Sequence, residues 1–206
     1  MREYPIIFSG DHPRKTLDLG KTQTRRVIKP QPKLRHLGYM MNYEGTGAIQ
    51  CGADYPDTDK DFIKCPYGQV GDRLGVKETH YRFGDWNKNG LTKTGRQKWR
   101  FQAVNNEVRY FDNPPDKVRP NSFRALGWYK RPSIFLPKRY IRIWLEITEV
   151  RVERLRSISP TDALAEGGYT VDGFIKMYLI INHLPEDANP WNWALRYKLL
   201  GVGNKF

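Results

Sequence analysis

The chain has 206 residues, 39% of them hydrophobic and 13% aromatic, which is enough to bury a core in one domain with insertions or in two small domains. Its 35 Lys and Arg residues against 22 Asp and Glu residues give a formal net charge of +13, and such an excess favours polyanionic partners by long-range attraction. No apolar run approaches the roughly 18 residues of a membrane span and the N-terminal apolar segment is too short for a signal peptide, so a cytoplasmic protein with no membrane partner is expected.

The N-terminal residues predict a strand, a short helix and a second strand. YPIIF (4–8) is typical of a strand. Asp11 is a candidate N-cap, Pro13 falls in the first turn and Gly20 follows the end, which predicts a helix over DHPRKTLDL. The Thr and Val content of TQTRRVI favours an extended strand, which Pro30 and Pro32 close.

The middle of the chain alternates between ordered segments and insertions. Residues 31–68 carry scattered Gly, Pro and Asp with little periodicity, which is typical of a long loop. GQVGDRLGVKETHYRF then predicts a turn and a strand. A second polar insertion, 84–97, precedes KWRFQAV and EVRYF, and the Asn-Asn pair between these two segments predicts a hairpin turn. Residues 112–138 are rich in proline and aromatic residues and are expected to lie over the surface.

The clearest strand is RYIRIWLEITEVRVERL. Isoleucine or leucine occupies every second position from 141 to 147, whereas Val150 and Val152 have the opposite parity. This change predicts a bulge near Thr148 and Glu149.

Two helices and a last strand are predicted after it. In SPTDALAEGG, Ser159 is the expected N-cap, Pro160 the first helical residue and Gly167 the stop. GFIKMYLIINHL predicts a second helix, and PWNWALRYKLL a final strand. Many short strands with two or three short helices indicate an α+β fold, built as a small, partly open β-barrel that is mixed but mostly antiparallel.

The stretch LGKTQTRRVIKP (19–30) begins like a phosphate-binding loop. A Walker A loop needs G-x-x-x-x-G-K-[ST], but the residue five positions before Gly20 is Lys15. The residues before Gly20 are also predicted to be helical, whereas that motif precedes a helix. We therefore exclude nucleoside triphosphate binding by this route.

Two stretches, 25–35 and 128–142, are dense in positive charge, and the second also holds Trp and Tyr residues. Cations that neutralise phosphates and rings that stack on bases are what single-stranded nucleic acid requires. An equally good interpretation of these two stretches is a strand face exposed to solvent, with the aromatic rings in the core. The residues expected to bind nucleic acid are Arg25, Arg26, Lys29, Lys77, Lys130, Arg131, Lys138 and Arg139.

Lys21 and Thr24 are candidate catalytic residues. In a strand they would face opposite sides, so a turn or the strand's entry has to bring them together. Arg25 and Arg26 disfavour another positive charge and are expected to lower the pKa of Lys21, which could then act as a base toward the Thr24 hydroxyl. The alternative role of Lys21 is that of a cation favoured beyond a helix C-terminus.

Glu166 is the third candidate. It falls in the last turn of the helix predicted over 160–166, where a carboxylate opposes the helix dipole by a few tenths to about 1 kcal/mol. A local rule broken without visible compensation often marks function, although exposure to solvent could make the same charge harmless.

Six segments, which reach about residue 194, carry a family resemblance: PIIFSG, GKTQTRRVIKPQP, CPYGQVGDRLGVKETH, KRPSIFLPKRYIRIWLEITEVRVERLRSIS, DALAEGG and NPWNW. Taken together, they resemble the ASCH family of the PUA-like superfamily, and most of all its long form found in phages and prophages. The resemblance implies a single domain over 1–206 with a PUA-like β-barrel, flanking helices and loop insertions at about 31–68, 84–97 and 112–138. It also implies a basic cleft suited to RNA or a modified nucleobase.

The resemblance also implies a reaction. Small ASCH proteins hydrolyse N4-acetylcytidine with a lysine and a threonine from a G-[RK]-K-T-x-T type segment and a glutamate near the end of the later helix. Lys21, Thr24 and Glu166 match these positions. Thr24 would act as nucleophile or orient water, Lys21 would be the base, and Glu166 would shuttle a proton to the leaving amine. Arg25 or Arg26 would hold phosphate or stabilise the oxyanion.

Other functions stay open at this point. The chain could be a non-catalytic RNA- or DNA-binding adaptor, a ribonuclease using the same cleft, or a phage protein that binds a host or phage protein through its insertions. No cofactor and no metal site are expected, because Cys51 and Cys65 form no CxxC pair and their spacing to the histidines matches no zinc motif.

Overall fold

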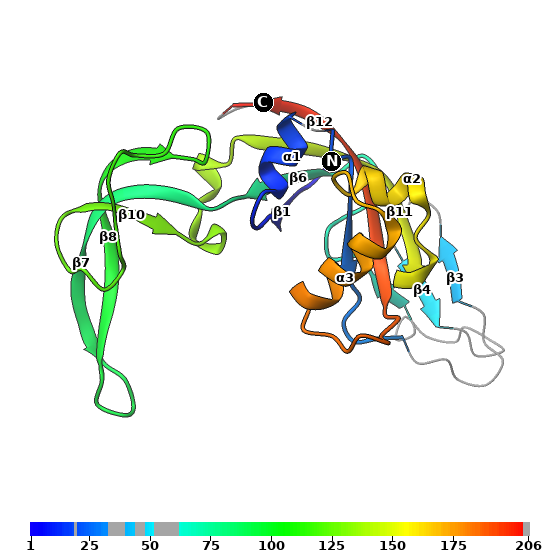
Figure 1. The fold of residues 1–206 in the computed structure, drawn as a ribbon, viewed down its shortest axis with the longest axis horizontal. Helices are drawn as coiled ribbons and strands as arrows, with labels where there is room; N and C mark the ends of the chain where they lie inside the picture. Colours follow the sequence, from blue (N-terminus) through cyan, green and yellow to red (C-terminus); the bar gives the residue numbers. More distant parts are fainter. Residues whose placement is uncertain (19, 33–39, 44–47, 52–61, 204–206) are drawn as a thin grey trace. The chain divides into compact units, whose positions relative to one another are not determined.

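The computed structural model describes most of the chain and divides it into two units. It covers residues 1–18, 20–32, 40–43, 48–51 and 62–203, with the backbone alone for 40–43, 48–51 and 62. Unit 1 comprises Met1–Ile6, Asp11–Val76 and Arg142–Phe206, and unit 2 comprises Ile7–Gly10 and Lys77–Ile141 (Figure 1). The expectation of a single domain over all 206 residues stays a prediction.

A five-stranded sheet in the order β1-β6-β11-β12-β2 forms the frame of unit 1. The longest pair, β11 with β12, is antiparallel and runs from Ile143 opposite Val202 to Arg154 opposite Trp191. β12 also pairs antiparallel with β2, which brings the segment after the first helix against the C-terminal strand. The strands are β1 (Glu3–Ile7), β2 (Gln23–Val27), β6 (Arg73–Lys77), β11 (Ile143–Arg154) and β12 (Trp191–Val202).

The bulge expected in β11 is confirmed. The pairing with β12 shifts register between Ile147 and Glu149, and Thr148 is exposed at that point. Before the bulge Ile143, Leu145 and Ile147 are buried, and after it Val150 is buried on the opposite parity. One extra residue therefore keeps the apolar side chains of both halves of the strand in the core.

The α-helices in the described part of unit 1 occur where the sequence predicts them. They are α1 (His12–Asp18), α2 (Pro160–Ala165) and α3 (Val171–Ile181). The Ser159 hydroxyl accepts a hydrogen bond from the Asp162 backbone N–H, which confirms the predicted N-cap. Gly20 and Gly167, which follow α1 and α2, have φ of +67° and +121°, a left-handed conformation that glycine adopts without strain.

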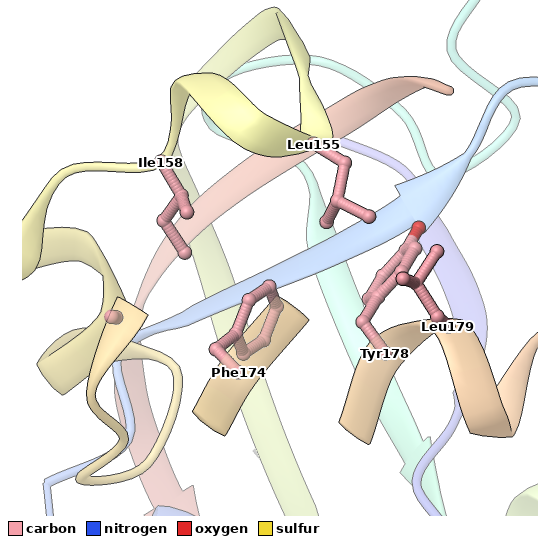
Figure 2. Packing of buried hydrophobic residues seen from close by; sticks show 6 residues of the cluster. Leu155, Ile158, Phe174, Tyr178 and Leu179 are labelled. Carbon is pink, nitrogen blue, oxygen red and sulfur yellow. The ribbon is translucent and has the colours of Figure 1, made fainter. Parts of the chain in front are cut away.

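A hydrophobic cluster packs α3 against the end of β11. Leu155 and Ile158 come from the short 3-10 turn Leu155–Ser157 and the residue after it, and their side chains point toward α3 (Figure 2). Phe174, Tyr178 and Leu179 present one helical stripe to them and are at most 5% exposed. Because the cluster also includes Ala163 of α2, it holds both α2 and α3 against the end of β11.

The insertion 31–68 contains a sheet in addition to loop. Its antiparallel strands, in the order β3-β4-β5, are Met40–Tyr43, Ala48–Cys51 and Phe62–Lys64. The loop prediction is wrong for these segments, which are only three or four residues long and therefore too short to show periodicity. For residues 33–39, 44–47 and 52–61, the loop prediction lies outside the described residues.

Unit 2 is built on a four-stranded sheet in the order β8-β7-β10-β9, drawn in green in Figure 1. β7 pairs antiparallel with β8 and β10, whereas β10 and β9 are parallel. The strands are β7 (His80–Leu91), β8 (Gln97–Arg109), β9 (Val118–Arg119) and β10 (Gly127–Arg131).

The predicted hairpin turn at Asn105 and Asn106 is wrong. Both residues lie inside β8, where the pairing shifts register between Arg82 and Gly84 of β7 and the extra residues of β8 form a bulge. The turn lies at 92–96 instead, closed by the hydrogen bond from Thr92 N to Arg96 O (2.8 Å). The polar insertion predicted at 84–97 is therefore mostly paired strand.

Residues 112–138 do not lie only over the surface. They contain β9, β10 and the 3-10 turn Ser133–Phe135, and both Tyr129 and Leu136 are fully buried. In β10 the buried residues Gly127 and Tyr129 alternate with less buried neighbours, and this two-residue period is hidden by the prolines on either side.

The fold is α+β, rich in strands, and the pairs between described strands are mostly antiparallel, as predicted. Among the described residues, no helix is long and apolar enough to cross a membrane.

Candidate functional site

Lys21 and Glu166 meet inside unit 1. Lys21 lies between α1 and β2, directly after Gly20, and Glu166 is the C-cap of α2. The Lys21 ammonium donates to Glu166 Oε2 (3.0 Å), to the Glu166 carbonyl (2.6 Å) and to the Gln23 carbonyl (2.7 Å). Both residues are 2% exposed. All three protons of a buried ammonium thus have acceptors.

The unfavourable position of Glu166 at a helix C-terminus is compensated. Lys21 donates to the backbone carbonyl at the end of α2 as well as to the carboxylate, and Arg25 Nη1 donates to Glu166 Oε1 (3.2 Å). The two cations offset both the helix dipole and the charge of the carboxylate. The broken local rule that singled out Glu166 therefore has a structural explanation in these contacts.

Arg25 is enclosed by carboxylates. Its side chain has no exposed surface and pairs with Glu153 (2.7 Å), Asp162 (3.1 Å) and Glu166 (3.2 Å). The role of Arg25 in binding nucleic acid stays a prediction. In this structure its Nη1 and Nη2 groups already donate to three carboxylates. The sequence could not show this, since the three carboxylates are more than 120 positions away in the chain.

The ion pairs continue toward the surface through Asp162. Arg151 Nη2 contacts Asp162 (3.2 Å) and Arg196 Nη2 contacts it at 3.5 Å, with Arg151 28% and Arg196 48% exposed. Gln23 is fully buried and its Oε1 accepts from Arg151, whereas its Nε2 has no hydrogen-bond acceptor among the described residues. We call Lys21, Gln23, Arg25, Glu153, Asp162, Glu166 and Arg151 the buried ion-pair network.

Lys21 and Asp162 are two members of this network whose pKa values are shifted. Burial lowers the pKa of Lys21, Glu166 opposes this, and Arg26 and Lys15 lower the pKa further. The direction agrees with the sequence-based expectation, but burial is the main cause. Burial alone raises the pKa of Asp162, but Arg151 and Arg25 together outweigh burial and the pKa is lowered.

Thr24 does not lie with the other two candidates. It is buried in β2, between Gln23 and Arg25, whose side chains both contact the buried ion-pair network. Because side chains alternate along a strand, Thr24 faces the other side of β2. The structure therefore brings Lys21 and Glu166 together and leaves Thr24 apart.

The remaining residues predicted to bind nucleic acid are divided between the two units. In unit 1, Arg26 is half-buried and Lys29 is exposed. The other five, in unit 2, are half-buried or exposed, and Lys77 donates to the Ile134 carbonyl (2.8 Å). They are Lys77, Lys130, Arg131, Lys138 and Arg139.

The positive charge is concentrated in unit 2. This unit holds 15 of the 35 Lys and Arg residues but only 5 of the 22 Asp and Glu residues, a formal net charge of +10 out of the +13 of the chain. Unit 1 has the remaining 20 basic and 17 acidic residues, a net charge of +3. The attraction for polyanions thus belongs mostly to unit 2, away from Lys21 and Glu166 in the chain.

No protein-family model, curated protein or solved structure matches the chain. Membership of the ASCH family therefore stays a prediction from the segments quoted above.

Arginines lie over aromatic rings throughout unit 2, and the sequence analysis did not identify most of these residues as candidates. Arg131 lies over Phe101 (4.5 Å to the ring centroid), and Arg124 lies over Trp99 (4.7 Å). Alternating Arg and aromatic residues in strand-like segments, as in His80–Phe83, was a signal that could have found them. Further pairs are Arg82 with Tyr140, Arg109 with Trp128, Arg119 with Phe123 and Arg139 with Tyr140.

Proposed function

We propose that the protein binds nucleic acid, and that unit 2 is the part that binds it. The observation that carries this proposal is the net charge of +10 on a unit of 69 residues. A polyanion that contacts such a surface gains free energy by releasing its condensed counterions. A PUA-like, ASCH-type barrel in unit 1 is part of the proposal, supported by the matching sequence segments.

The arrangement of the charges supports nucleic acid over other polyanions. Many of the arginines lie over rings, and Arg109 of β8 over Trp128 of β10 places a phosphate-binding group beside a stacking surface on one sheet. Guanidinium groups bind phosphate through paired donors and also stack on bases, whereas a sulfated polysaccharide has no bases that could stack.

The experiment compares two charge-matched variants. Lys88, Arg100 and Lys130 are exposed in unit 2, and Arg14, Lys64 and Lys176 are exposed in unit 1. Each triple substitution to Gln removes three positive charges, and fluorescence anisotropy with a labelled oligonucleotide measures affinity. We expect at least a tenfold loss with the unit 2 variant and less than a threefold loss with the unit 1 variant. Equal losses would contradict binding by unit 2.

A second candidate function rests on the contact between Lys21 and Glu166. A lysine with a lowered pKa beside a carboxylate, with the unsatisfied Gln23 Nε2 nearby, supports hydrolysis of an acylated base such as N4-acetylcytidine. Water would add to the acyl carbon, the C–N bond would break, and the proton taken from water would end on the leaving amine. Lys21 has to release its acceptors for this step, because its three donors are taken.

Incubation with N4-acetylcytidine, followed by chromatography, tests this candidate. We expect cytidine release that is lost in Lys21→Ala and Glu166→Ala and kept in Lys176→Ala. Loss of cytidine release in Thr24→Ala would indicate that the Thr24 hydroxyl takes part in the reaction, whereas unchanged release would indicate that it only packs. Absence of turnover, or turnover that is equal in all variants, excludes hydrolysis of this base. Cleavage of RNA that depends on Lys21 would support the nuclease alternative.

A further inference from the structure

One face of the unit 2 sheet carries a pair of half-exposed rings. Phe83 of β7 and Trp128 of β10 are directly opposite each other in the ladder, with ring centroids 5.6 Å apart and planes at 66°. Tyr81 is two residues along β7 and pairs with Lys130. All three rings are half-buried, and Lys130 is exposed.

The other face of the same strands is closed. Its residues in β7 and β10 include His80, Arg82, Gly84 and Tyr129, all of which are buried. Tyr129 packs edge-on against Phe101 and Trp86 there (5.7 and 5.9 Å between centroids). The core of the unit thus lies on the Tyr129 face, and the rings of Phe83 and Trp128 are on the opposite, more accessible face.

Cations surround the accessible rings. The Arg109 guanidinium lies 4.9 Å from the Trp128 ring centroid and pairs with Glu107 (2.8 Å). Lys130 follows Trp128 by two residues and therefore projects on the same face. A strand of nucleic acid across this face would find a positive group on each side of the rings.

A polar cavity lies farther along the same hairpin. Its volume is about 560 Å³, and Asn87, Arg100 and Gln102 line it. Asn87 Nδ2 donates to Gln102 Oε1 (2.7 Å). Asn87 is four residues from Phe83, on the same face of β7 and about 13 Å along the strand. Amide side chains and an arginine are the groups that hydrogen-bond base edges and phosphates.

We propose that this face binds single-stranded nucleic acid, with bases stacked on Phe83 and Trp128 and phosphates held by Arg109, Lys130 and Arg100. The proposal rests on the proposed function, since it assigns the strandedness and the contact residues of the same binding. Stacking on a protein ring requires an unpaired base, because the bases of a duplex are already stacked on each other. The rings therefore predict a preference for a single strand that charge alone does not give.

The test measures affinity for three probes: a 20-nucleotide oligouridylate, oligodeoxythymidylate of the same length, and a blunt DNA duplex. Phe83→Leu keeps the apolar bulk and removes the ring, and Trp128→Leu does the same. The matched control is Phe123→Leu, which removes a 46% exposed ring that also lies under an arginine (4.5 Å) but is outside the four strands. Circular dichroism confirms that each variant is folded.

We expect each of Phe83→Leu and Trp128→Leu to weaken single-strand binding about tenfold and duplex binding less than twofold, with Phe123→Leu unchanged. The oligouridylate and oligodeoxythymidylate arms show whether the 2′-hydroxyl contributes. Single-strand affinity that is unchanged in both variants, or lost equally for the duplex, overturns this inference and leaves nucleic-acid binding by unit 2 standing. Failure of the wild-type chain to bind any probe overturns both.

Discussion

The pair of Lys21 and Glu166 is expected to behave as one energetic unit. Glu166→Gln leaves the Lys21 ammonium and Arg25 next to a neutral amide, and loss of one partner of a buried pair costs about 3–5 kcal/mol. The loss of stability in Glu166→Gln should be about 3 kcal/mol, because Lys21 keeps two carbonyl acceptors and Arg25 keeps Glu153 and Asp162. Lys21→Met leaves the buried Glu166 carboxylate with Arg25 as its remaining cation, and should lower the free energy of unfolding by about the same amount.

The double variant should cost less than the two single costs added together. A coupling free energy of about 2 kcal/mol is expected, since groups in direct contact couple by roughly 0.5–3 kcal/mol. Urea unfolding followed by circular dichroism gives the four free energies of unfolding. The control cycle uses Lys198→Met and Glu146→Gln, whose ion pair is 2.9 Å long against 3.0 Å for Lys21 and Glu166 but has side chains 59% and 28% exposed. This control should show a coupling free energy of less than about 1 kcal/mol. Additive costs for Lys21 and Glu166 would refute a buried, coupled pair.

Three further outcomes follow from the structure. Burial lowers the pKa of His80 in the folded chain to about 4, below its value of about 6.5 in the unfolded chain. As the pH falls from about 6.5 to 4, the unfolded chain therefore takes up a proton that the folded chain does not, and the free energy of unfolding decreases. In unfolding measured against pH, His80→Gln should remove up to about 3 kcal/mol of this decrease. The lowered pKa of Asp162 contributes stability above about pH 4 that is lost at lower pH, so Asp162→Asn should flatten the acid limb of the same curve, and an unchanged limb would contradict it. Gly84→Ala should cost about 1–3 kcal/mol, because its Cβ would lie 2.2 Å from the Gln102 carbonyl, whereas Gly203→Ala has nothing within 4 Å and should be near neutral in thermal melts.

The features that were predicted correctly depend on residues close together in the chain. The N-cap at Ser159, the stop at Gly167 and the bulge near Thr148 each follow from a short pattern, and each is present. Asn105 and Asn106 have the composition of a turn, but pairing with β7 keeps them in a strand as a bulge. Here the tertiary context decides against the local preference.

The candidate site shows the same limit. Lys21 and Glu166 could be named from local signals, and their contact across 145 positions of the chain agrees with their pairing. Nothing near Arg25 in the sequence indicates that Glu153 and Asp162 enclose it, so its burial could not be predicted. The net charge was visible in the composition, but its concentration in unit 2 depends on where the chain divides.

Nucleic-acid binding by unit 2 is tested most directly by the salt dependence of affinity for a 20-nucleotide single strand. If about five phosphates are engaged, log K falls against log salt with a slope of about −3.5 between 50 and 300 mM salt. Removing Lys88, Arg100 and Lys130 should make that slope shallower by about 2, whereas removing Arg14, Lys64 and Lys176 should leave it unchanged. A slope near zero, or the same slope in all three proteins, would contradict binding through the charge of unit 2.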